Sequence, residues 1–170
     1  MQQILLNSCA RASTAAESRF RINAPIASSR ATRVVALDEG AEPVVRRVAA
    51  QEWASARFFT CTSPAASAES NGGLGDVVLR STADGEESRL SEQLTDADVA
   101  VMVATANDGA ATASAIGDAC TLRGIMTAGL VLADGYDTNA AVAALRPHAR
   151  VLIVTHDERD VSEVLTALRA

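Results

Sequence analysis

The sequence contains no lysine, since all 15 of its basic residues are arginines. This absence excludes the phosphate-binding lysine of a Walker-type loop, a Schiff-base lysine and the usual lysine of a receiver domain. Aromatic residues make up only 3% of the chain, so it offers no stacking platform for single-stranded nucleic acid. No apolar run approaches the roughly 20 residues that a membrane-spanning helix needs. A chain of 170 residues that is 48% hydrophobic is nevertheless long enough for one buried core.

The charge and the cysteine content further narrow the class of protein to which this chain can belong. The net charge is −6, but residues 1–33 hold five of the 15 arginines and only one of the 21 acidic residues. The rest of the chain is therefore acidic, which excludes a nucleic-acid-binding surface there. Three cysteines with no CxxC motif and no zinc spacing predict a reducing, cytoplasmic location. We expect Cys61 and Cys120 to be small buried hydrophobic residues.

The chain divides into a leader, residues 1–31, and a single domain, residues 32–170. The leader is rich in Arg, Ser and Ala and nearly free of acids. It is interpreted as a flexible segment or a short docking helix, and a transit-peptide-like function also stays open.

From residue 33 onward, apolar strands alternate with amphipathic helices. We predict strands at 33–37, 57–61, 77–80, 99–104, 125–132 and 151–154. Helices are expected from Pro43 to about residue 53, at 86–94, at 112–122 ending near Gly124, after a cap at Asp137 or Thr138, and at the C-terminus. Strands that read as continuously apolar predict a parallel sheet covered on both faces. The expected fold is α/β, a three-layer, doubly wound, mainly parallel sheet of Rossmann-like type.

Acidic residues follow the strands at the edge where such sheets bind ligands. They are Asp38, Glu39, Asp108, Asp134, Asp137, Asp157 and Glu158. Helix N-capping explains them most simply. A hard cation such as Mg²⁺, bound by Asp38 and Asp108, is an alternative. A general base at His156 beside Asp157, and a nucleophile at Cys61, are further hypotheses.

Three segments resemble the GTPase half of the FtsZ/tubulin family. They are LTDADV at 94–99 leading into the strand that ends at 104, TAGLV at 127–131, and RVLIVTHDER at 150–159. The resemblance runs with gaps from about Arg33 to Ala170 and keeps the order of strands and loops. It implies an FtsZ-like fold with a nucleotide bound between the loops that follow the first and the central strand.

The signature loops of that family are changed in this chain. Where the family has GGGTGTG, this chain has NDGAATA at 107–113, and only Gly109 and Thr112 match. The first phosphate loop reads DEGAEP at 38–43, in which only Gly40 matches. Asp157 aligns with the guanine-contacting Asn. If nucleotide binding is retained, the resemblance implies that Gly40, Gly109, Ala110, Thr112 and Asp157 carry it. Asp108 would place a carboxylate where a phosphate should lie.

We therefore expect an FtsZ-like domain without GTPase activity that acts as a protein-interaction or scaffold module. GTP binding is expected to be weak or lost, with Mg²⁺ as a further candidate cofactor. The chain stops before the family's long central helix, catalytic loop and second domain, so polymer-activated hydrolysis is not expected. A protein partner or a homo-oligomer is predicted. Three alternatives stay open: a small-molecule enzyme using the acidic strand ends, a functional GTP-binding protein, and a Rossmann-like subunit that docks through residues 1–31.

Overall fold

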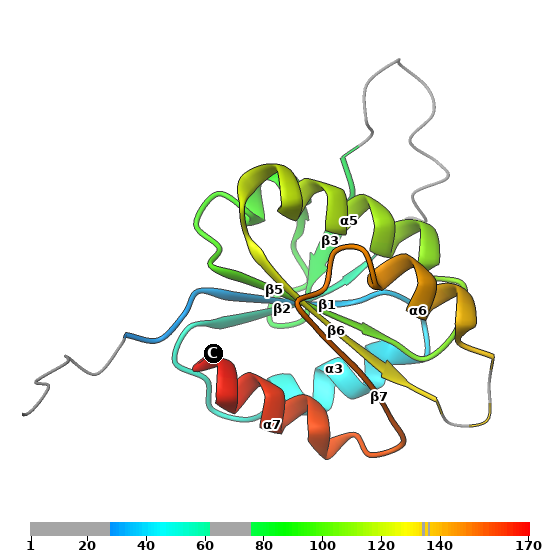
Figure 1. The fold of residues 1–170 in the computed structure, drawn as a ribbon. Helices are drawn as coiled ribbons and strands as arrows, with labels where there is room; N and C mark the ends of the chain where they lie inside the picture. Colours follow the sequence, from blue (N-terminus) through cyan, green and yellow to red (C-terminus); the bar gives the residue numbers. More distant parts are fainter. Residues whose placement is uncertain (1–27, 62–75, 134, 136) are drawn as a thin grey trace, which may run out of the picture.

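The computed structural model describes residues 28–61, 76–133, 135 and 137–170. Within them lies one seven-stranded sheet of order β4-β3-β2-β1-β5-β6-β7 (Figure 1). Five strands are parallel: β1 (Thr32–Ala36), β2 (Ala56–Cys61), β5 (Val99–Ala104), β6 (Met126–Leu132) and β7 (Val151–Thr155). β3 (Val78–Ser81) and β4 (Glu87–Arg89) continue the sheet as antiparallel strands beyond β2. The predicted α/β class and its Rossmann-like, mainly parallel layout are confirmed.

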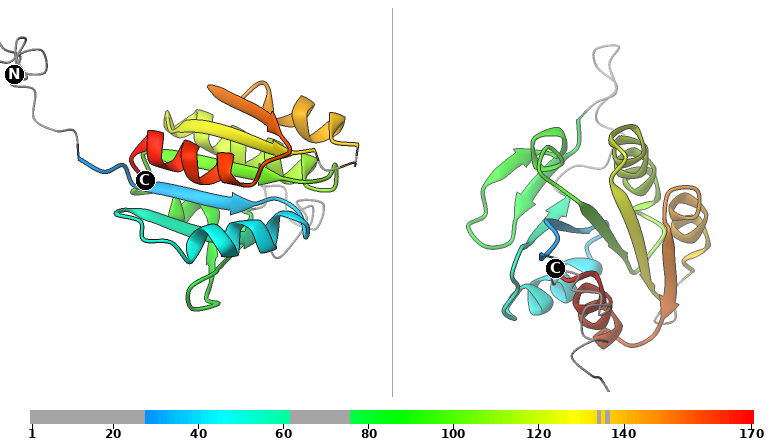
Figure 2. Two further views of the ribbon diagram at one scale, coloured as in Figure 1. Left: turned by 90° about the horizontal axis from the view of Figure 1, so that it is seen from below. Right: turned by 60° about the vertical axis from the view of Figure 1, so that its left-hand side comes forward.

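Helices cover both faces of the sheet (Figure 2). α3 (Ala41–Ala49) and α7 (Arg159–Leu168) pack on one face. α4 (Leu90–Gln93), α5 (Ala110–Arg123) and α6 (Asn139–Leu145) pack on the other. The central strand β5 is therefore buried along its whole length, which explains why its sequence is apolar without alternation. Among the described helices, none is long and apolar enough to cross a membrane.

The strand order changes direction between the parallel neighbours β1 and β5, which form the switch point of the sheet. β1 leads through α3 to β2 on one side, whereas β5 leads through α5, β6 and α6 to β7 on the other. β1 and β5 are neighbours, with Ala36 opposite Val103. The loops that follow them therefore diverge from adjacent points at the carboxyl edge, which is the usual ligand-binding position in open α/β sheets.

The predicted helix at 86–94 is wrong in its first half. Glu87–Arg89 forms β4, and only Leu90–Gln93 is helical. The β4 side chains are exposed, half-buried and exposed in turn, and Arg80 of β3 pairs with Glu87 at 2.8 Å. Pairing with β3 thus overrides the local helical propensity.

The cysteine prediction holds for Cys120, which is fully buried, whereas Cys61 is only partly buried at the end of β2. Gly124 ends α5 in the left-handed conformation, with φ of 69°, as expected of a helix-terminating glycine. Most of the leader, the loop 62–75 and Asp134 lie outside the described residues.

Candidate functional site

At the crevice expected between the loops after β1 and β5, the side chain of Asp38 bridges the two loops. Its Oδ2 accepts hydrogen bonds from the backbone N–H groups of Thr105 (2.7 Å) and Ala106 (3.1 Å). Its Oδ1 accepts from the Thr105 hydroxyl (2.6 Å) and from the Ala41 N–H (2.9 Å). One carboxylate thus satisfies the first turn of α3 and two amides of the loop after β5.

Both glycines that match the family pattern lie where these loops touch each other. A Cβ on Gly40 would lie 2.1 Å from the Thr105 Oγ1. A Cβ on Gly109 would lie 2.6 Å from the Leu37 Cβ and 2.7 Å from the Leu37 carbonyl oxygen. Neither glycine has a positive φ, since φ is −69° at Gly40 and −80° at Gly109. Their small size is therefore used for loop-to-loop packing.

Asn107 ties a third element to the same edge. Its Oδ1 accepts hydrogen bonds from the Ala140 N–H (2.8 Å) and the Ala141 N–H (3.2 Å), the first turn of α6. Of the two caps that the sequence suggested for this helix, Thr138 makes no capping side-chain bond, and the Asp137 Oδ1 accepts from the Asn139 N–H at 3.0 Å. The loop after β5 therefore caps a helix 33 residues away in sequence.

The structure brings only part of the predicted nucleotide set together. Gly40 and Gly109 lie at the crevice, and the half-buried Ala110 follows in the first turn of α5. Thr112 is only 2% exposed, so its hydroxyl does not face the loops' solvent side. Asp157 follows β7, which β6 separates from β5. Its Oδ1 accepts from the Arg159 N–H at 2.9 Å, near the start of α7.

The two residues proposed for a metal site differ in their surroundings. Asp38 directs both of its oxygens at hydrogen-bond donors, whereas Asp108 is exposed. Among the described residues, no group of three or more His, Cys, Asp or Glu is arranged to hold a metal ion. Asp38 and Asp157 each accept from the N–H of the first residue of a helix, although the N-cap positions themselves are Gly40 and Glu158.

The other candidate catalytic groups are poorly placed for chemistry. Burial raises the pKa of the Cys61 thiol to about 12, which leaves very little reactive thiolate at neutral pH. His156 is exposed in the loop after β7, and the neighbouring Asp157 carboxylate accepts from backbone and lies 3.8 Å from the Arg159 Nε.

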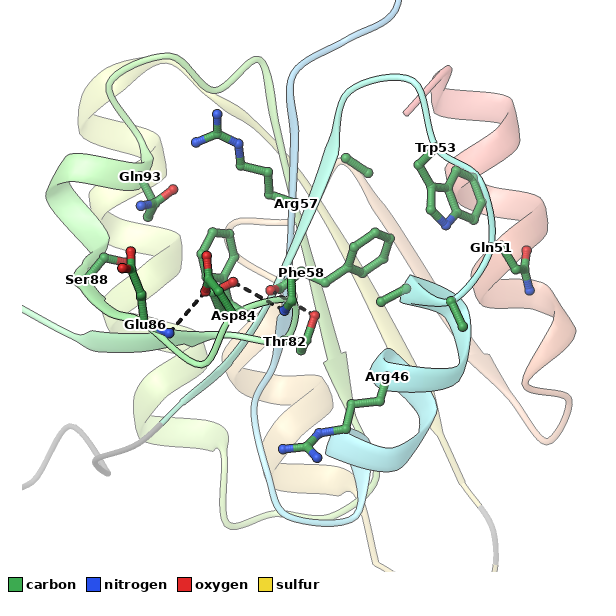
Figure 3. Close-up of a pocket in the computed structure, with 16 residues that line it drawn as sticks. Arg46, Gln51, Trp53, Arg57, Phe58, Thr82, Asp84, Glu86, Ser88 and Gln93 are labelled. Carbon is green, nitrogen blue, oxygen red and sulfur yellow. Dashed lines mark hydrogen bonds between the residues drawn. The ribbon is translucent and has the colours of Figure 1, made fainter.

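An open groove of about 840 Å³ lies where β2 begins, away from the predicted edge (Figure 3). Trp53 and Phe58 line one part of it, with ring centroids 6.2 Å apart, and Arg57 and Gln93 line another. The turn between β3 and β4 closes it, and the Thr82 N–H donates to the Phe58 carbonyl at 2.9 Å.

The sequence analysis did not predict this groove, because β4, which completes the β3–β4 hairpin beside it, lies in a segment predicted as helix. Behind Gln93, the Arg33 Nε donates to the Gln93 carbonyl at 2.9 Å. Burial, together with the nearby Arg57 cation, lowers the pKa of the Arg33 guanidinium.

Together the sheet, its switch point and the loop contacts define a Rossmann-like α/β domain in which Asp38 bridges the two loops at the carboxyl edge. A scan against models of protein families gives no match for this chain, and a search of curated proteins gives no significant match.

Proposed function

We propose that this chain is an FtsZ/tubulin-like α/β module that lacks GTPase activity and works through protein contacts, with GTP binding weak or lost. The observation that carries the proposal is the fourfold hydrogen bonding of Asp38 across the crevice. In an open phosphate loop, backbone N–H groups at a helix N-terminus stay free for an anion. Here the amides of Ala41, Thr105 and Ala106 already donate to a carboxylate.

Electrostatics point the same way. A polyphosphate bound between these loops would meet Asp38 itself, with Glu39 and Glu42 close to it in sequence and Asp108 in the loop after β5. Like charges at contact distance are strongly unfavourable unless a cation or a proton intervenes. The acidic loops also disfavour the binding of small anionic substrates other than nucleotides.

Titration of the full chain with GTP, GDP and ATP, with and without Mg²⁺, tests the proposal by calorimetry. No saturable binding below about millimolar nucleotide is expected. Asp38→Ala, which frees the amides, serves as the comparison, and Asp108→Ala is the matched control because it removes an exposed acid from the neighbouring loop. Tight, guanine-specific binding by the unaltered chain would overturn the degraded-site interpretation.

A Mg²⁺ titration on the same samples addresses the rival enzyme hypothesis. A metal-dependent rise in thermal stability that Asp38→Ala or Asp108→Ala removes would favour a metal site over the interaction module. We expect no such rise in any of the three proteins, because the Asp38 oxygens are already engaged by hydrogen-bond donors.

A further inference from the structure

The edge strand β7 exposes apolar surface that the rest of the described domain buries. Val151 is 44% exposed and Val154 is 53% exposed, and they are two of the three large hydrophobic side chains exposed among the described residues. The third, Leu122, lies on α5. Among the described strands, β7 pairs only with β6, so one side of its backbone faces outward, between α6 and α7 (Figure 2).

The two edges of the sheet are built differently. β4, at the opposite edge, is three residues long and presents Glu87 and Arg89 to solvent, a common protection against edge-to-edge pairing. β7 reads VLIVT, with no charge, proline or glycine. An edge without protective residues is suited to accepting another strand.

The backbone geometry defines which groups are free to pair. The Thr155 carbonyl accepts from the Ala133 N–H, which follows β6, at 2.8 Å. In a parallel pair, alternate residues face the neighbouring strand, so Val151 and Ile153 also face β6. Leu152 and Val154 consequently direct their N–H and C=O groups away from the sheet.

We propose that β7 is a self-association edge that pairs antiparallel with β7 of a second copy of this chain, about a two-fold axis at Ile153. This names a partner for the interaction function proposed above and rests on it. In this register Leu152 lies opposite Val154 of the second copy, and Arg150 lies opposite its His156. The outward N–H and C=O groups of both strands then meet as hydrogen-bonded pairs.

Charge at the ends of β7 selects a second copy as the occupant. Arg150, which precedes the strand, is exposed and makes no recorded ion pair within the described part of the chain. Asp157 follows the strand, and Glu158 beside it already pairs with Arg47 of the same chain at 2.6 Å. Antiparallel self-pairing brings the basic end of each strand to the acidic end of the other, and a two-fold interface does so twice.

Sedimentation of the full chain over a range of concentrations tests the proposal. The unaltered protein is expected to show a monomer–dimer equilibrium. Val154→Lys and, independently, Val151→Lys are each expected to raise the dissociation constant at least about tenfold, because lysine on an edge strand opposes pairing. Leu122→Lys is the matched control, since it makes the same chemical change at an exposed apolar site on α5 and should leave the equilibrium unchanged.

A second pair of variants tests the charge argument. Arg150→Glu should weaken the dimer by a similar factor, because it places an acid against Asp157 of the other copy, whereas Arg57→Glu at the far side of the sheet should not. Backbone hydrogen exchange then tests the register. The Leu152 and Val154 amides should be protected at high concentration and lose protection on dilution, and circular dichroism confirms that each variant is folded.

Each result bears on one conclusion. A monomer at all concentrations overturns the self-association edge, whether its amides exchange freely or are covered by another segment of the same chain. A dimer that Val151→Lys, Val154→Lys and Arg150→Glu leave intact also overturns it. Neither outcome alters the nucleotide titration, so loss of this inference is distinguishable from loss of the proposed function.

Discussion

Removing the Asp38 carboxylate should destabilise the fold, and the structure allows the cost to be estimated. Four donors converge on its two oxygens. Hydrogen bonds to a charged group contribute about 1.5–3 kcal/mol each, although contributions at one site do not add fully. Because Asp38 is only partly buried, water in the variant replaces the lost carboxylate as the acceptor for some of these donors. We therefore expect Asp38→Ala to lower the free energy of unfolding by about 3 kcal/mol.

Asp38→Asn gives a graded version of the same test. An asparagine keeps one carbonyl oxygen for the Thr105 and Ala106 N–H groups, and its NH₂ can donate to the Thr105 hydroxyl, which rotates to accept. Only the Ala41 N–H then loses its partner. The expected loss is about 1–2 kcal/mol.

Urea denaturation followed by circular dichroism measures these changes as shifts in the midpoint at constant slope. Asp108→Ala and Asp108→Asn, in the exposed part of the neighbouring loop, should stay within about 0.5 kcal/mol of the unaltered protein. If Asp38→Ala proves as stable as the unaltered protein or more so, the carboxylate is a source of repulsion and the bridging interpretation is refuted.

Three further predictions concern the same edge of the sheet and the core. Gly109→Ala should cost about 2–4 kcal/mol in chemical denaturation, because the new Cβ would lie 2.7 Å from the Leu37 carbonyl oxygen and backbone must shift; a loss under 0.5 kcal/mol would contradict the contact. Asn107→Ala should cost about 1 kcal/mol by the loss of the α6 cap, with hydrogen exchange of the Ala140 amide rising as its local readout. Burial raises the pKa of Cys120 to about 11 from 9.0, so the folded state holds this proton more tightly than the unfolded state. The free energy of unfolding should therefore fall as pH rises from 9 to 11, and it should fall less steeply in Cys120→Ala than in the unaltered chain. Equal slopes in the two proteins would contradict the raised pKa of Cys120.

The architecture was predictable because its signals are local and repeated. The run Val99–Ala104 indicates a strand buried on both faces, and Gly124 marks a helix end without reference to any distant residue. The strand β4 escaped prediction because its reason for being extended is its partner β3. The three residues of β4, two of which are charged, form too short a pattern to indicate that the segment pairs with β3.

The position of Asp38 in the fold was predictable from the sequence, but its hydrogen bonds were not. The sequence placed Asp38 directly after the first strand, at the carboxyl edge of the sheet, and helix capping was the simplest interpretation of it. The same carboxylate also accepts hydrogen bonds from the N–H groups of Thr105 and Ala106, which are 67 and 68 residues away. These bonds form only because β1 and β5 are neighbours in the sheet. Thr105 itself was read as part of a small-residue loop. The position of its hydroxyl, directly after the central strand, was the one sequence signal that could have indicated a bond to Asp38.

An internal carboxylate competes with a free anion on favourable terms. Asp38 is covalently held beside its donors and loses little further freedom on binding, whereas a free phosphate group loses translational and rotational entropy. If closure of the crevice by Asp38 is worth about 3 kcal/mol, the open form is populated to less than about 1%, and the apparent affinity of any anion that needs it falls by at least 100-fold. Displacement would also leave the carboxylate beside the phosphate. One internal carboxylate is therefore enough to compete with a free anion for the amides of these two loops.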